Sequence, residues 1–445
     1  MMYVLKNGSV LQVETGKFVL QDVFIEGHQI IKMDEQINIE GAEVIDCTGK
    51  YLIPGLIDMH VHIKNHFATY FTAAGVTTVR NTAGSVIELK PFMKAEANNP
   101  IPRVISADRM IDGPPGLWGE TTPYNINIEH IEDAKREVER QVNLGADFIK
   151  IYGWLKPDIM KAVIDEAKKY GKEVSCDILH SNDVDALDVA EMGMDWLEHA
   201  SGIVQAMYPE WNMKSEKDVW DMIPWDAPDE EKIMEVCQKL LEKNIKLCPT
   251  LVLYDQMQKA EEHWQVDDER IHHQMNHSSS FNHWEPMAQG KTGQSSIGIQ
   301  TKMIQKIAYT YYKLGGVVVT GTDTPAGIFT YPGMALHREL QLFVEAGFTP
   351  LEALQQATIN AAKALQQPFI GQLKEDFIAD IVVLNENPLT NIEHTMAIHS
   401  VIKGGTPYTI EQLLSFIPSD EEKMHYIQTL LEEFKNHGLR VEHLV

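Results

Sequence analysis

Residues 51–62 read YLIPGLIDMHVH, an apolar run that ends in two histidines one residue apart. Successive side chains of a β-strand point to opposite faces, so His60 and His62 are expected on one face, with Val61 turned into the packing. Two neutral imidazoles at a strand end form half of a metal site, because each offers one unprotonated nitrogen. An HxH pair also arises by chance on a polar strand face, so the remaining sequence must decide between the two interpretations.

After residue 62 the sequence alternates β-rich runs with helical patterns, which is typical of βα units and a parallel sheet. With the 51–62 run, seven further segments make eight strand candidates: 75–81, 102–107, 145–153, 172–180, 194–202, 244–254 and 315–324. Eight such strands predict an α/β fold of the (β/α)8 TIM barrel type, in which the active site lies at the C-terminal strand ends.

Polar residues fall at the C-terminal limits of several of these segments: His60, His62, Lys150, His180, His199 and Asp323. A single histidine or lysine at a strand end is usually only solvated or hydrogen-bonded. Six such residues at the mouth of one barrel are difficult to explain by chance, so the sequence predicts a metal site there.

The flanking regions follow other patterns. Residues 1–55 are β-rich, with Asn7–Gly8 as a hairpin signal, and form the first half of a small β-domain. Inserts at about 203–243 and 254–305, rich in Trp, Met and His, are expected to cover the barrel mouth as lids. Residues 406–445 predict a helical extension whose apolar stripe packs on the barrel or, alternatively, builds a contact in a homo-oligomer.

Composition excludes several classes of protein. The net charge of −26 over 445 residues argues against a nucleic-acid surface, because phosphate binding needs clusters of Lys and Arg. The four cysteines lack CxxC spacing, which predicts neither a disulfide framework nor a cysteine zinc site and fits a reducing compartment. The sequence shows no signal-peptide pattern and no apolar run of membrane length. We therefore expect a cytoplasmic protein that acts on a small-molecule substrate, with no nucleic acid and no membrane as partner.

Seven motifs together resemble the amidohydrolase superfamily, metal-dependent hydrolases on a distorted (β/α)8 barrel with a flanking β-sandwich. They are PGLIDMHVH at 54–62, GVTTVRN at 75–81, GADFIKIY at 145–152, LEHASG at 197–202, GTDTP at 321–325, EAGFTPLEALQQATINAAKAL at 345–365 and IADIVVLNENPL at 378–389. The most similar branch contains imidazolonepropionase-like enzymes, carboxylated-lysine prolidases and Xaa-Arg dipeptidases. The resemblance implies a composite β-sandwich domain from residues 1–55 and 366–405, and a metallohydrolase barrel at 56–365.

The resemblance also implies the roles of four residues in a binuclear metal centre. His60 and His62 match the metal ligands of the first strand, and His199 matches the ligand of the sixth. Asp323 matches a ligand that also serves as the catalytic general base and acid. Zinc is the default ion for such a site, but histidine-rich sites also accept other divalent metals.

Two further positions leave alternatives open. Lys150 matches the lysine that carries a carbamate bridging the two ions, and its apolar neighbours favour the neutral amine that takes up carbon dioxide. If Lys150 instead forms an ion pair, the site is mononuclear. His180 takes the ligand position of the fifth strand, with Asp177 as the rival ligand, because CDILHSN replaces the family's His-Ala-His or His-Ala-Tyr ending.

The expected reaction is hydrolysis of an amide C–N bond in a dipeptide, an N-acyl amino acid or a cyclic amide. Two ions about 3.5–4 Å apart can hold a bridging hydroxide and polarise the carbonyl, while Asp323 moves the proton to the leaving nitrogen. A deaminase, a hydrolase of esters or lactones, and a non-catalytic scaffold protein on the same fold are the alternatives. Candidate substrate contacts near the predicted strand ends are Tyr152, Trp118, Arg80 and Tyr254.

Overall fold

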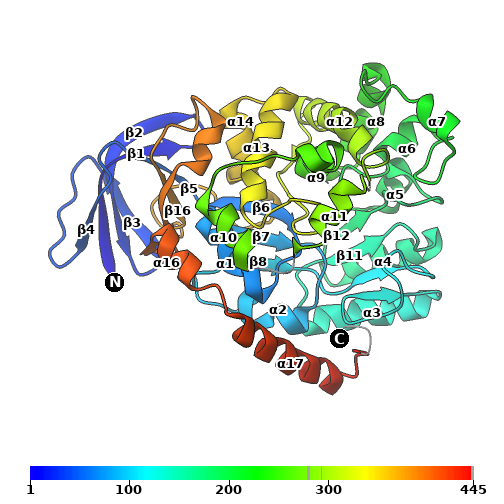
Figure 1. Ribbon diagram of the computed structural model, residues 1–445, viewed down its shortest axis with the longest axis horizontal. Coiled ribbons are helices and arrows are strands. Elements are labelled where there is room, and N and C mark those ends of the chain that lie inside the picture. Colours follow the sequence, from blue (N-terminus) through cyan, green and yellow to red (C-terminus); the bar gives the residue numbers. More distant parts are fainter. Residues whose placement is uncertain (278–280, 292, 442–445) are drawn as a thin grey trace.

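The structure, a computed structural model, describes residues 1–277, 281–291 and 293–441. Its centre is a ring of parallel strands surrounded by helices (Figure 1). The strands of the ring are β6 (Leu56–Val61), β7 (Val76–Asn81), β8 (Arg103–Ser106), β11 (Ile149–Tyr152), β12 (Val174–Asp177), β13 (Trp196–Glu198), β14 (Lys246–Cys248) and β15 (Val317–Val318). These are the eight segments expected from the sequence, so the predicted α/β barrel is confirmed.

Three kinds of pairing close the ring. The strands β6, β7 and β8 form one parallel sheet, and β11 to β15 form another. A bridge between Ala107 and Phe148 joins β8 to β11. The backbone N–H of Met59 donates to the Thr320 carbonyl at 3.0 Å, and a bridge between Val61 and Thr324 continues this pairing. The residues after β15 therefore complete the barrel against β6.

Helices surround the outside of the barrel (Figure 1). Those that follow barrel strands or complete the ring are α1 (Ala68–Ala73), α2 (Val86–Met93), α3 (Ile131–Leu144), α4 (Pro157–Lys169), α5 (Ala186–Met192), α8 (Glu230–Glu242), α12 (Thr301–Lys313), α13 (Met334–Ala346), α14 (Pro350–Gln356) and α15 (Ile359–Ala364). The long excursions after β13 and β14 contain α6 (Ile203–Met207), α7 (Lys217–Asp221), α9 (Leu251–Lys259), α10 (Glu269–His277) and α11 (Trp284–Gln289). Short strands β9 (Met110–Asp112) and β10 (Asn125–Asn127) extend the sheet beside β11.

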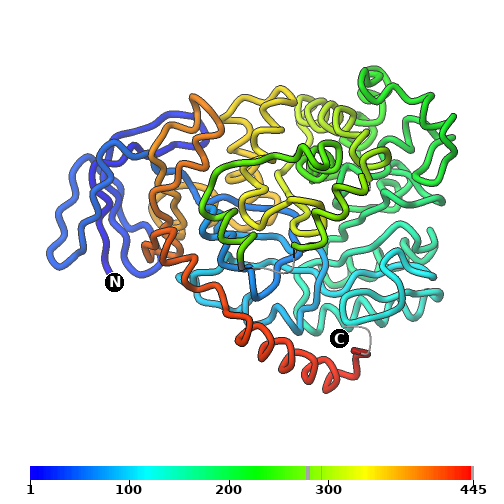
Figure 2. The backbone as a smooth tube through the Cα atoms, in the orientation of Figure 1, coloured from blue at the N-terminus to red at the C-terminus, as the bar shows by residue number. Residues whose placement is uncertain are grey.

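A mixed sheet built from both ends of the chain flanks the barrel. It contains β1 (Met2–Gln12), β2 (Lys17–Glu26), β3 (Gln29–Asp34), β4 (Glu43–Asp46), β5 (Tyr51–Pro54), β16 (Ile381–Leu384), β17 (Ile398–Lys403) and β18 (Thr406–Tyr408). Its order is β18-β17-β16-β5-β1-β2-β3, with β4 paired to β1, and Figure 2 shows the N-terminal segments beside the C-terminal ones. The expectation that the two chain ends share one sheet is confirmed.

Local structure differs from expectation in three places. Asn7–Gly8 forms no hairpin turn; β1 runs through it with a bulge between Leu5 and Gly8, and Asn7 has a φ of 58°. The pattern at 350–365 gives two helices, because the Ala357 carbonyl accepts the N–H of Ile57 at 2.8 Å instead of continuing the helix. The strand at 244–254 ends at Cys248, and α9 begins two residues after Pro249.

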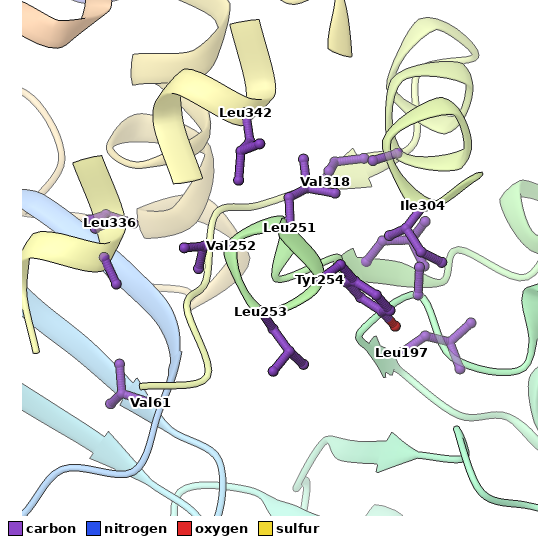
Figure 3. Packing of buried hydrophobic residues seen from close by; sticks show 14 of the residues in the cluster. Val61, Leu197, Leu251, Val252, Leu253, Tyr254, Ile304, Val318, Leu336 and Leu342 are labelled. Carbon is purple, nitrogen blue, oxygen red and sulfur yellow. The ribbon is translucent and has the colours of Figure 1, made fainter. Parts of the chain in front are cut away.

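Burial on both strand faces explains why the barrel strands are nearly continuous apolar runs. Every residue of β6, β7 and β11 is buried. Figure 3 shows one part of this core, in which Leu251, Val252 and Leu253 at the start of α9 belong to the same buried cluster as labelled side chains of β6, β13, β15, α12 and α13. The Glu339 carboxylate accepts the N–H groups of Leu251 and Val252 at 3.0 and 2.7 Å, which fixes this helix end inside the core.

The C-terminal helices are α16 (Ile410–Ser415) and α17 (Asp420–Asn436), and α17 begins with a capping box of Ser419 and Glu422. Leu430 and Phe434 are buried against Ile87 of α2, and Phe434 meets the Tyr124 ring edge-on at 5.7 Å. The predicted stripe therefore packs on this chain's own barrel (Figure 1). Within the described ranges, no helix combines the length and apolarity that crossing a bilayer requires.

Replacing Phe434 by Ala is expected to detach α17, because the side chain is fully buried and such truncations cost about 3–5 kcal/mol. Hydrogen exchange should show lost protection across 420–436 with protection retained in the barrel strands. Met424→Ala, at a side chain that is 54 % exposed on the same helix, is the control. Equal protection in the Phe434→Ala and control variants would contradict this packing.

His337 on α13 is expected to make stability depend on pH. The ring is fully buried, with Nε2 3.0 Å from the Ala74 carbonyl, and burial lowers the pKa of His337 to about 3. Below about pH 6.5 the unfolded chain takes up a proton that the folded protein refuses, so stability falls by up to about 1.4 kcal/mol per pH unit until the folded pKa is reached.

His337→Asn should reduce the loss of melting temperature between pH 6.5 and 4, measured by calorimetry. The exposed His425 supplies the matched control, and His425→Asn should follow the wild-type curve. A His337→Asn variant with the same acid dependence as the wild type would refute the assignment.

Candidate metal centre

The two histidines of the first barrel strand meet Asp323 across the closing seam of the barrel. His60 Nε2 lies 3.1 Å and His62 Nε2 lies 2.9 Å from the same oxygen, Asp323 Oδ1. His60 is completely buried, whereas the side chain of His62 is 21 % exposed and faces the barrel mouth. Backbone pairing produces this meeting, because the N–H of Asp323 donates to the His60 carbonyl at 2.8 Å.

His199 completes a group of three buried side chains whose ligand atoms all lie within 4.8 Å of one another, with His60 and Asp323. The His199 and His60 ring centroids are 4.6 Å apart. Among the described residues, two groups of three buried side chains could hold a metal ion, and this group is one of them. The structure thus brings together ligands that are 263 positions apart in the sequence, from His60 to Asp323.

A hydrogen bond at Nδ1 fixes each of these imidazoles. The partners are Glu198 Oε2 for His60 at 2.7 Å, the Ala83 carbonyl for His62 at 3.3 Å, and Thr250 Oγ1 for His199 at 2.7 Å. Carboxylate and carbonyl oxygens only accept, and the Thr250 hydroxyl already donates to the Pro249 carbonyl. Each Nδ1 therefore carries the proton, which leaves Nε2 of a neutral ring with a free lone pair.

This tautomer places lone pairs against a carboxylate. Nε2 of His60 and His62 both approach Asp323 Oδ1 to about 3 Å, and neutral rings have no proton there to donate. His60 Nε2 makes no hydrogen bond of ordinary geometry to any described residue. Acceptor atoms at this separation repel one another unless a positive charge lies between them. The donor set therefore fits a divalent cation, for which imidazole and carboxylate are common ligands.

The charge of the site favours a cation in the same way. Burial favours the neutral ring of His60, but the carboxylates of Glu198 and Asp323 outweigh it and raise the pKa of His60. Burial also opposes the charge on Asp323, yet the neighbouring His60, His62 and His199 side chains hold the pKa of that carboxyl well below its usual range. Burial lowers the pKa of His199 to about 4, which keeps this ring neutral and able to bind a metal.

The end of the fifth barrel strand offers Asp177 rather than His180. Strand β12 ends at Asp177, whose Oδ2 lies 3.6 Å from His199 Nε2. His180 follows in a turn, where its backbone carbonyl accepts the indole N–H of Trp154 at 3.0 Å. Neither metal cluster found among the described residues contains Asp177 or His180, so the choice between them rests on the approach of Asp177 to His199. The geometry therefore supports Asp177, the alternative in the sequence interpretation, at this position.

Lys150 lies on β11 inside the barrel. Its side chain is among the largest that are fully buried, and its Nζ has no hydrogen-bond acceptor among the described residues. The nearest aromatic partner is the Tyr152 ring, whose centroid is 5.3 Å from Nζ. A buried ammonium without an acceptor is costly, and the structure shows no ion pair among the described residues that would explain Lys150 as a purely structural residue.

Glu198 and Arg80 form a support behind His60 that sequence reasoning missed. Arg80 donates to Glu198 Oε1 at 2.7 Å, while the other carboxylate oxygen binds His60. The guanidinium lies over the rings of Phe148 and Trp196, 4.2 and 4.4 Å from their centroids. Arg80 is 2 % exposed, so it positions a ligand instead of meeting substrate as expected. The available signal in the sequence was Glu198, the acidic residue directly before His199 in the LEHASG motif.

Tyr254 also supports a ligand. Its ring is fully buried and its hydroxyl donates to the His199 carbonyl at 2.8 Å. This bond fixes a backbone in an unusual conformation, because His199 has a φ of 59°. Asp323, with a φ of 55°, shares this left-handed region, which non-glycine residues rarely occupy. The reversal at His199 lets the adjacent Glu198 and His199 both point into the barrel.

The second buried group consists of His60, Glu198 and Cys248. Cysteine binds metals as the thiolate, but burial raises the pKa of Cys248 well above its usual value. Glu198 is already shared between Arg80 and His60. This group therefore supports the metal centre and adds no ligand.

Comparison with known proteins identifies the family. Ochratoxinase from Aspergillus niger is 24 % identical over 327 residues, which cover 69 % of this chain and 55 % of that protein. Dihydroorotase from Carboxydothermus hydrogenoformans is 50 % identical over 62 residues, 14 % of either chain. The aligned regions thus span about half of the first of these curated relatives and a seventh of the second.

Solved structures share the fold over nearly the whole chain. A prolidase complexed with N-methylphosphonate-L-proline has a TM-score of 0.65 and 20 % identity, over 92 % of this chain and 100 % of that one. A Xaa-Pro dipeptidase with bound methionine has a TM-score of 0.67, 20 % identity and the same coverage. Residues 51–407 match the model of the amidohydrolase family, and the chain therefore belongs to that family.

Proposed function

We propose that this protein is a metal-dependent hydrolase of amide C–N bonds, acting on a dipeptide, an N-acyl amino acid or a cyclic amide. The observation that carries the proposal is the meeting of acceptor atoms at the barrel mouth, where Nε2 of His60 and His62 face Asp323 Oδ1 at 3.1 and 2.9 Å. A structural role gives no reason for such an arrangement, since unpaired acceptors in a buried site are costly.

Six residues would hold two ions. His60, His62 and Asp323 would bind one, and His199 and Asp177 the other. Lys150, as a carbamate formed with carbon dioxide, would supply an oxygen to each, which accounts for a fully buried amine without an acceptor among the described residues. Bound divalent ions supply a hydroxide at neutral pH and polarise the carbonyl of the substrate.

Asp323 is the residue proposed to move the proton. An amide nitrogen leaves only when it is protonated, so the proton removed from the attacking water must reach that nitrogen. The Asp323 carboxylate is 7 % exposed and lies beside the mouth-facing His62, where a substrate carbonyl has access. Its left-handed backbone and the His60 carbonyl fix its position, which preorganises this transfer.

The functional test is a screen of dipeptides and N-acyl amino acids with protein loaded with zinc in the presence of bicarbonate. We expect release of free amino acids that stops when a chelator removes the metal. Asp323→Asn should lower kcat by about 10²–10⁴, the contribution of a general base. A protein with full metal content and no hydrolysis of any amide would overturn the proposal.

Lys150→Ala should lower the metal content to one ion or none per chain, because the bridging oxygens are lost. Elemental analysis of the purified variant measures this directly. Lys156→Ala removes an exposed lysine just beyond the same strand and should retain the wild-type content. Two bound ions in the Lys150→Ala variant would exclude the carbamate bridge.

Asp177→Asn and His180→Asn separate the two candidates for the fifth-strand ligand. The Asp177 carboxylate lies 3.6 Å from His199 Nε2, so its loss should weaken binding of the second ion by about 10–100-fold in a competition titration with a chromogenic chelator. His180→Asn should leave that affinity unchanged. The opposite pattern would restore His180 as the ligand.

A further inference from the structure

An apolar surface joins the two sides of the candidate metal centre. Ala83, Met110 and Tyr152 form one buried cluster, with Leu117 packed against it. The Ala83 carbonyl accepts the hydrogen bond from His62 Nδ1. Tyr152 lies two residues after Lys150, so the two side chains share one face of β11. The surface therefore begins at metal-site residues on either side and leads away from them.

Trp118 continues this surface toward solvent. Its ring meets the Tyr152 ring edge-on, with centroids 6.5 Å apart and an interplanar angle of 86°. Tyr152 is 3 % exposed, whereas Trp118 is 58 % exposed. We call these two residues the aromatic wall. The wall begins at the Tyr152 ring, whose centroid lies 5.3 Å from Lys150 Nζ, and ends at the exposed indole of Trp118.

The loop that carries Trp118 is tied down in spite of this exposure. The buried carboxylate of Asp112 accepts the N–H groups of Gly113, Leu117 and Trp154 at 2.9, 2.8 and 3.1 Å. Through Asp112, these bonds connect Gly113 and Leu117 of the loop to Trp154, the second residue after the end of β11. Burial raises the pKa of Asp112, and the three donors oppose that rise.

Asn127 of β10 secures the far side of the loop. Its amide donates to the carbonyls of Pro115 at 3.0 Å and Gly119 at 2.8 Å. Gly116, with a φ of 89°, leaves no room for a side chain, since an added Cβ would lie 2.3 Å from the Gly119 carbonyl oxygen. The loop is thus built to hold one shape.

An exposed indole on a fixed loop has the properties that a binding contact needs. Exposing the ring costs hydrophobic free energy, and fixing the loop spends conformational entropy before any ligand arrives. Covering the ring with an apolar group removes its surface from water, and the fixed loop then loses little further conformational entropy. The position of the wall, continuous with Lys150 and His62, places that group beside the reacting amide.

We propose that the aromatic wall receives a large apolar or aromatic side chain of the substrate, next to the scissile amide bond. This assignment rests on the hydrolase function proposed above and narrows its substrates to amides that carry such a side chain. The wall is then the specificity determinant of the site, and Trp118 contacts the substrate while taking no part in bond cleavage.

The test compares zinc-loaded wild type with Trp118→Ala and Trp118→Phe on substrates matched in pairs. N-acetyl-L-phenylalanine is compared with N-acetylglycine, and phenylalanyl-glycine and glycyl-phenylalanine with glycyl-glycine. The wild type should prefer the aromatic member of at least one pair in kcat/KM. Trp118→Ala should reduce this preference about five- to tenfold, within the range of one aromatic contact, and Trp118→Phe should keep most of it.

Phe369→Ala is the matched control, because Phe369 is 55 % exposed and lies near the mixed sheet, outside the wall. It should keep the full wild-type preference. A preference that is equal in wild type and Trp118→Ala would overturn the proposal while leaving amide hydrolysis intact.

A binding measurement separates this proposal from the proposed function. If the wild type hydrolyses none of these amides, calorimetric titration with N-acetyl-L-phenylalanine and N-acetylglycine reports on the wall alone. Tighter binding of the aromatic ligand that is lost in Trp118→Ala would support the wall although the hydrolase function failed. Equal binding of both ligands by the wild type would overturn it.

Discussion

The candidate metal centre depends on the closure of the barrel between β6 and the residues that follow β15. Backbone bonds run from Met59 to Thr320, from Thr322 to His60 and from His62 to Thr324, at 3.0, 3.1 and 2.8 Å. They bring His60 in β6 and His62 directly after β6 to one carboxylate oxygen of Asp323. A shift of one residue in this pairing would turn Asp323 away from the histidines, so the register of a single seam decides whether the site exists.

Around this seam, buried ion pairs and hydrogen bonds fix the candidate ligands. Arg80 neutralises Glu198, Glu198 orients His60, and Thr250 orients His199. Such buried ionic groups cost desolvation free energy, which the packing of the barrel must supply. This desolvation cost is consistent with a site that must present lone pairs in fixed directions, because a side chain that is free to rotate would bind a metal less tightly.

The sequence predicted the barrel well because the relevant signals are local. Alternation in a strand places His60 and His62 together, and apolar runs bounded by helical patterns mark all eight strands. What it could not settle depends on tertiary contacts. Strand β12 ends at Asp177 and His180 follows in a turn, and no local pattern fixes that end point.

The role of Arg80 also depends on tertiary contacts that the local sequence does not show. A charged residue near a strand end looked like a substrate contact, but Phe148, Trp196 and Glu198 enclose it from distant parts of the chain. The hairpin expected at Asn7 failed for a similar reason. Asp22 on the neighbouring strand accepts the Asn7 N–H at 2.9 Å, which keeps the strand pair continuous through a bulge.

The mixed sheet also bears on how the chain is made in the cell. Strand β5, which leads directly into β6, pairs with only two residues of β1 but with four of β16. During synthesis from the N-terminus, β5 therefore remains an open edge until residues 381–384 have left the ribosome. Neither the sheet nor the seam beside it can be completed before most of the chain exists, so the nascent protein must keep that edge unpaired until β16 has emerged.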